Sequence, residues 1–169
     1  MTDQLEFKIV NTNEDWMDDS EFKGNIAEIY INGQEIIPLL KKIEEPYAAK
    51  EGHFDIAGAY GHRLPQELYE ELTEVFCEGT YAHEEGVELL CCGDCGLSGC
   101  WSIVVYVKQD ENYVYWYKFR QNHREWEYNL SYKFEKNVYM QALKQLRCDC
   151  QADARTVTFE KCSENNVEE

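Results

Sequence analysis

Residues 101–119, WSIVVYVKQDENYVYWYKF, decide the fold, because they combine two strand patterns with the turn that joins them. The polar run 109–112 predicts the turn, and residues 113–119 are rich in the Tyr and Trp side chains that favour strands. Apolar side chains alternate along the first half, as in a strand with one buried face: Trp101, Ile103, Val105 and Val107. The stretch therefore predicts an outgoing strand and its return partner.

Further strand patterns lie on both sides of this hairpin. Asn32-Gly33 readily supplies two positive φ angles, so it predicts a hairpin turn after a strand at 24–31. The other expected strands are residues 4–10, 87–92 and 156–159. A nine-residue half-buried strand is predicted where large apolar side chains alternate with polar neighbours: Trp126, Tyr128, Leu130, Tyr132 and Phe134.

Three helices are expected between these strands, near residues 38–45, 65–77 and 137–147. Pro38 fits the first turn of the first helix, where a missing N–H costs nothing, and Pro46 is expected to end that helix. Apolar residues line one face of each of the other two helices: Leu68, Leu72, Val75 and Phe76 in one, and Val138, Ala142, Leu143 and Leu146 in the other.

Mainly antiparallel strands with about three packed helices are typical of the α+β class. The chain has 169 residues, a length that suits one domain. We therefore expect a single domain over residues 1–162, followed by a disordered acidic tail at 163–169.

The charge is strongly negative and unevenly distributed. The formal net charge is −17, and residues 1–90 hold 21 Asp and Glu against 6 Lys and Arg. Such a surface repels phosphate backbones and anionic lipids, so we expect neither a nucleic-acid nor a membrane partner. The excess either keeps the surface solvated or forms an acidic face for a basic partner protein, as in an immunity protein.

Eight cysteines are many for this length, and they cluster. The sequence has no apolar run of membrane-spanning length and no secretory signal, which predicts a cytoplasmic protein. In a reducing compartment, clustered cysteines point to metal or redox chemistry rather than to disulfides. Zinc takes four ligands, and Cys92, Cys95 and Cys100 are expected to provide three of them. The fourth is expected from Cys148 or Cys150.

Two other interpretations of the cysteines stay open. The favoured one is a tight glycine turn with buried thiols, in which Cys100 belongs to the core. The other is a redox pair or a catalytic thiolate, which needs a neighbouring His or Arg. We expect no cofactor unless these cysteines hold zinc, because the chain has neither a phosphate-binding glycine loop nor a dinucleotide fingerprint.

A basic and aromatic segment stands out from the acidic background, at Arg120, His123, Arg124 and Trp126. Guanidinium and imidazole groups beside aromatic faces suit the carboxylate or phosphate of an anionic small molecule. His62 and Arg63 are a second His-Arg pair that would join this site if the fold brought the two pairs together. The alternative, which we favour, is a turn whose arginines pair with the protein's own acids.

Several motifs occur in a fixed order over residues 24–146, among them INGQEI at 31–36, AGAY at 57–60, CGLSGCW at 95–101 and HREWEY at 123–128. This series resembles a group of uncharacterised bacterial cytosolic proteins with a Cys-Gly-x-x-Gly-Cys-Trp turn and a His-Arg-x-Trp-x-Tyr segment. The chain departs from the group's pattern at Ser102-Ile103, Asn122 and Glu127, where Pro-Leu, Pro and Asp are usual. The resemblance implies the fold and a bacterial cytosolic setting, and it brings no known activity.

Two functions follow from these patterns. The favoured one is a non-enzymatic binding protein that meets a basic partner through its acidic N-terminal part. The alternative is a cysteine- or zinc-dependent enzyme or redox protein acting on an anionic small molecule. The sequence contains no recognisable catalytic motif and does not indicate an oligomeric state.

Overall fold

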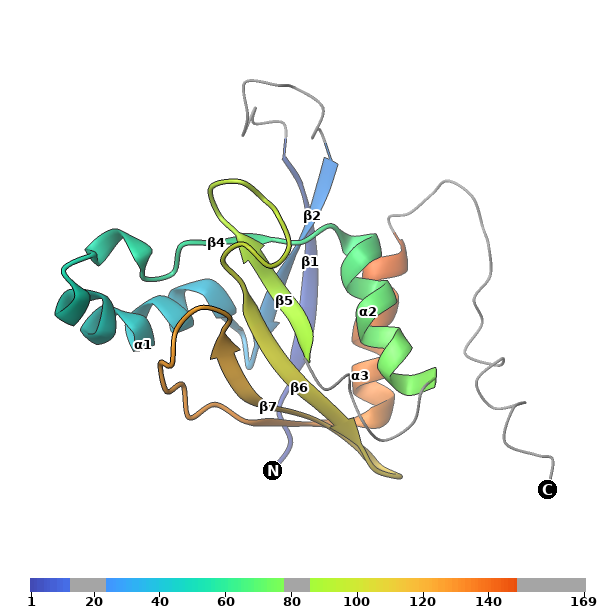
Figure 1. Cartoon of the computed structure of the whole chain (residues 1–169). Coiled ribbons are helices and arrows are strands. Elements are labelled where there is room, and N and C mark those ends of the chain that lie inside the picture. Colours follow the sequence, from blue (N-terminus) through green and yellow to red (C-terminus); the bar gives the residue numbers. More distant parts are fainter. Residues whose placement is uncertain (13–23, 78–85, 149–169) are drawn as a thin grey trace.

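The predicted hairpin lies at the centre of a five-stranded sheet in the computed structural model, which describes residues 1–12, 24–77 and 86–148 (Figure 1). The sheet is antiparallel throughout, with the strand order β4-β5-β6-β7-β8. Its strands are β4 (Tyr60–His62), β5 (Val87–Cys92), β6 (Ile103–Gln109), β7 (Tyr113–Gln121) and β8 (Tyr132–Glu135).

A second, three-stranded sheet is built from the N-terminal part of the chain. It contains β1 (Leu5–Thr12), β2 (Gly24–Ile31) and β3 (Gln34–Glu35), in that order. Asn32 and Gly33 have φ angles of 53° and 76°, as the predicted hairpin turn requires. The amide of Ala27 donates to the carbonyl oxygen of Arg63, so an isolated bridge connects β2 to the chain just after β4.

The helices are α1 (Ile36–Glu51), α2 (Pro65–Cys77) and α3 (Lys136–Cys148), with a short 3₁₀ turn, η1 (Phe54–Ile56), after α1. Helices α2 and α3 lie side by side, and α1 lies at the opposite end of the molecule (Figure 1). Trp116 of β7 is fully buried, and its indole N–H donates to the hydroxyl of Tyr139 on α3 at 3.0 Å. The fold is therefore α+β, as predicted.

Two predictions about the helices were wrong. Pro46 does not end α1, which continues to Glu51 because Ala48 is fully buried on the next turn. Both Pro46 and Lys42 are exposed, so water can satisfy the Lys42 carbonyl that loses its helical partner. Val138 does not line the core face of α3, and Tyr139 is buried there instead.

The nine-residue strand predicted at 126–134 is shortened to β8. Asn129 has a φ of 50°, a left-handed conformation that interrupts an extended chain. Residues 126 and 128 are buried as the alternation predicts, but they pack against α1 and its surroundings rather than pairing in a sheet. The expected strand 156–159 and the tail 163–169 lie outside the described residues.

No helix in the three described ranges is both long and apolar enough to pass through a lipid bilayer.

Candidate functional site

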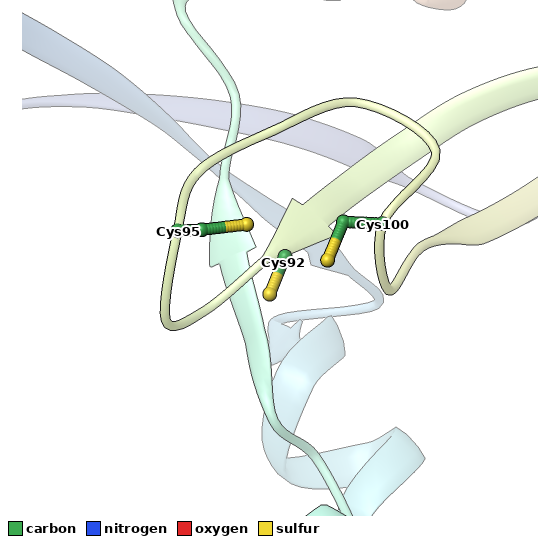
Figure 2. A group of neighbouring side chains, drawn as sticks. All are labelled: Cys92, Cys95 and Cys100. Atoms are coloured by element: carbon green, nitrogen blue, oxygen red, sulfur yellow. The ribbon is translucent and has the colours of Figure 1, made fainter.

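Three cysteine side chains meet where β5 ends, and we call Cys92, Cys95 and Cys100 the sulfur group. Their Sγ atoms all lie within 4.8 Å of one another. Cys92 is the last residue of β5, and Figure 2 shows the sulfurs of Cys95 and Cys100 turned toward it from either side of the loop. In a tetrahedral zinc site, Zn–S bonds of about 2.3 Å place the sulfurs roughly 3.8 Å apart. A contraction of about 1 Å or less therefore brings the sulfur group to metal-binding distances.

The backbone of residues 92–100, the cysteine loop, is shaped by glycine. Gly96 has a φ of 67°, and its amide donates to the carbonyl oxygen of Cys92 at 2.9 Å, which closes a turn around the first two sulfurs. Gly93 donates to the carbonyl oxygen of Ala59, and a Cβ at Gly93 would stand 3.0 Å from that same oxygen. The turn therefore fits closely against the chain that enters β4.

The far end of the loop is held by hydrogen bonds to Gly99. Its amide donates to Oε2 of Glu88 at 3.1 Å and to Oγ of Ser102 at 3.2 Å. Its carbonyl oxygen accepts from Nδ2 of Asn122 at 2.7 Å. These contacts fix the residue that precedes Cys100 against β5 and the end of β7.

The surroundings of the sulfur group shift the pKa values of Cys92 and Cys100 in opposite directions. Burial alone would raise the pKa of Cys92, but the backbone amides of Cys95 and Asp94 and the two neighbouring thiols lower that pKa overall. Hydrogen bonding to Cys95 and Cys92 raises the pKa of Cys100 to about 11. A thiolate is the form that binds a metal, and the lowered pKa makes Cys92 easier to deprotonate than Cys100.

Cys91 is not part of this group, because neighbouring residues of a strand point to opposite faces. It is buried, and its thiol donates toward the carbonyl oxygens of Gly61 and His62. Burial raises the pKa of Cys91 to about 11, so this cysteine is an inert core thiol.

Cys100 differs from its expected place, and the structure describes no side chain for Cys148 or Cys150. Cys100 is exposed, so the prediction that it belongs to the core was wrong. Strand β6 begins only at Ile103, and residue 100 belongs to the loop at the surface. Cys148 is the last residue of α3, and its side chain, like all of Cys150, lies outside the described part of the chain. Among the described residues, no fourth metal-ligating group joins the three sulfurs within the same distance.

Part of the basic and aromatic segment contacts Gly99 and Trp101, the two residues that flank Cys100. The ring of His123 stacks on Trp101, and Nε2 of His123 lies 3.2 Å from the carbonyl oxygen of Gly99. The guanidinium of Arg124 lies 5.1 Å from the Trp101 ring centroid and donates to Oε2 of Glu51 at 3.0 Å. Trp126 packs edge-on against Trp101 and donates to the same carboxylate. His123, Arg124 and Trp126 are thus brought together.

Arg120, His62 and Arg63 have other partners. Arg120 lies over the Tyr106 ring on the outer side of β7. Arg63 is buried, and it donates to Glu71 at 2.7 Å and to the carbonyl oxygen of Glu88 at 2.8 Å. His62 contacts Glu35 at 3.3 Å, and burial lowers its pKa despite the nearby charges of Glu35 and Glu28. The two His-Arg pairs therefore contact different sets of residues.

Sequence reasoning missed a buried carboxylate, Glu44 of α1. Tyr60 and Tyr128 donate their hydroxyls to its Oε1 at 2.6 and 2.7 Å, and the amide of Gly58 donates to its Oε2 at 2.7 Å. Burial raises the pKa of Glu44, while these three hydrogen bonds act to lower it. The spacing contained a signal, because Glu44 occurs at four-residue intervals with the buried Ile36, Leu40 and Ala48.

Comparison of the chain with protein-family models, with curated proteins and with solved structures found no match.

Proposed function

We propose that this protein binds one zinc ion through the thiolates of Cys92, Cys95 and Cys100, and that it acts as a non-enzymatic interaction protein. The observation that carries the proposal is the convergence of three Sγ atoms within 4.8 Å at the end of β5. Thiolates bind zinc, copper(I) and iron–sulfur clusters, and zinc is the single ion that commonly combines them with a histidine. The proposal includes a reducing compartment, because the thiols must stay reduced to bind the metal.

The fourth ligand in this proposal is His123. Its ring lies on Trp101 and its Nε2 lies near Gly99, so the imidazole contacts both residues that flank Cys100 in sequence. Coordination through Nε2 replaces the contact with the Gly99 carbonyl oxygen. A zinc ion with four protein ligands is a structural centre, and it would fix the exposed cysteine loop as part of a binding surface.

The first test is metal analysis of untagged protein purified without chelators. We expect about one zinc per chain, and less than about a tenth of that in Cys92→Ser. Cys91→Ser is the matched control, because its sulfur faces the other way, and it should keep the zinc. Absence of zinc in the parent chain, or equal loss in both variants, would overturn the proposal.

Cobalt(II) substitution tests the fourth ligand. We expect His123→Ala to shift the visible absorption of the cobalt protein and to weaken zinc binding by about tenfold or more. Cys148→Ser and Cys150→Ser should leave both unchanged. A shift in either cysteine variant, with none in His123→Ala, would instead assign the fourth ligand to the end of α3.

A second candidate function is chemistry on an anionic small molecule at the same centre. The exposure of Cys100 and the neighbouring His123 and Arg124 favour it. In that case zinc would keep an open position, as catalytic sites do, and His123→Ala would leave zinc content unchanged.

The interaction role rests on charge. The acidic excess of residues 1–90 suits a basic partner, as in an immunity protein. Capture of a cationic protein at low salt that is lost at high salt is the expected result. Capture that does not depend on salt would count against an electrostatic interface.

A further inference from the structure

The outer side of the five-stranded sheet carries tyrosines and lysines. Tyr115 of β7 lies opposite Lys108 of β6 and opposite Lys133 of β8, so these three side chains form a row across the strands. The intervening residues of β7, Val114 and Trp116, are fully buried on the other side. The full set, which we call the tyrosine–lysine face, is Lys108, Tyr113, Tyr115, Tyr117, Lys118 and Lys133.

The lysines of this face lie over aromatic rings, and one acid borders them: Asp110, which accepts from the hydroxyl of Tyr115 at 2.7 Å. Nζ of Lys133 is 3.8 Å from the Tyr113 ring centroid, and Nζ of Lys108 is 5.2 and 5.1 Å from the centroids of Tyr115 and Tyr117. Within the described part of the chain, none of the three lysines forms an ion pair with a carboxylate. The chain has 33 acidic residues for 16 Lys and Arg, so this local concentration of unpaired ammonium groups runs against its overall charge.

A β-bulge adds the third lysine. Two residues of β7 stand where β6 has one, between the pairs Val104↔Arg120 and Tyr106↔Tyr117. Lys118 lies in this bulge with a φ of 52°, a backbone conformation that residues other than glycine rarely adopt. Its ammonium group lies 5.9 Å from the Tyr117 centroid. Bulges re-aim side chains, and this one exposes a lysine directly after an outward-facing tyrosine.

We propose that the tyrosine–lysine face binds an acidic peptide segment of a partner protein. Ammonium groups donate to carboxylates, and the row across three strands places Lys108 and Lys133 on either side of Tyr115, where an extended chain can meet both. Single-stranded nucleic acid fits less well, because it needs free ring faces for base stacking, and lysines already cover these rings. The face lies apart from the sulfur group and does not depend on the metal.

The test is fluorescence anisotropy with a labelled peptide of alternating Glu and Gly, at low salt, with the full chain. We expect binding that weakens about tenfold in the double variant Lys108→Glu/Lys133→Glu. The control is Lys50→Glu/Lys144→Glu, which changes the charge equally at exposed positions of α1 and α3 and should weaken binding by less than about twofold.

Three results would overturn the proposal. They are no binding by the parent chain, equal weakening in both double variants, and tighter binding of single-stranded DNA than of the peptide at matched charge. Zinc-loaded and chelated protein should bind the peptide alike, so a failure here is distinct from a failure of the zinc proposal.

Discussion

Glu44 and the sulfur group are both polar clusters assembled by the fold, but they differ in completeness. Glu44 is fully buried, and three donors from β4, its preceding loop and the 126–131 segment occupy its two oxygens. In the sulfur group, exposure increases from buried Cys92 to exposed Cys100, and no further ligand atom of the described residues lies within 4.8 Å of all three sulfurs. A cluster that is closed and buried serves stability, whereas one that is open at the surface has capacity left for a ligand.

The largest expected effect separates the two clusters by stability. Glu44→Ala leaves two buried tyrosine hydroxyls and one amide without their acceptor, so we expect a loss of about 3–5 kcal/mol in the free energy of unfolding. Urea denaturation measures it. Glu45→Ala, at an exposed neighbouring position, should change stability by no more than about 0.5 kcal/mol. Equal effects in the two variants would show that the buried cluster is not a stability element.

Metal removal probes the other cluster. A ligand present at 100 times its Kd stabilises the folded state by about 2.7 kcal/mol, so chelation should lower the stability of the zinc-loaded chain by roughly that amount. Cys92→Ser should show no such response to chelator. If the parent chain has the same melting temperature with and without zinc, the sulfur group is not a metal centre.

Glu44 should also make the free energy of unfolding depend on pH. Burial raises the pKa of Glu44 in the folded state. At a pH between the ordinary pKa of Glu and this raised value, the folded chain therefore holds a proton that the unfolded chain has released. Stability from this residue is therefore fully present below the ordinary pKa of Glu and falls as pH rises toward the folded value. The slope is at most about 1.4 kcal/mol per pH unit.

Glu44→Gln removes this titration. The parent chain should lose stability relative to Glu44→Gln as urea unfolding is repeated from acid to neutral pH. A difference between the two proteins that stays constant with pH, or that grows in favour of the parent chain, would mean that the pKa of Glu44 is not raised.

The sequence predicted what depends on local patterns. The hairpin of β6 and β7, helix α2 and the Asn32-Gly33 turn follow from alternation, helical spacing and positive φ angles, all of which act within a few residues. It failed where tertiary packing overrode the local preference. The burial of Ala48 carries α1 past Pro46, and Trp126 and Tyr128 alternate in burial because they meet Tyr47 and Glu44.

The candidate site was predictable in part for the same reason. Cys92 and Cys95 are separated by two residues and share one turn, so their spacing alone predicts a shared site. The approach of His123 to the cysteine loop depends on the pairing of β6 with β7 and on the 122–126 segment that follows, which no local pattern reveals. The exposure of Cys100 likewise depends on how Gly99 is tied to Glu88 and Asn122.

X-ray absorption at the zinc edge of untagged protein tests the central claim most directly. Three sulfur ligands at about 2.3 Å and one nitrogen at about 2.0 Å are expected in the parent chain, and the sulfur signal should survive in Cys91→Ser. A zinc shell of nitrogen and oxygen alone, or a protein without zinc whose thiols all react freely, would contradict it.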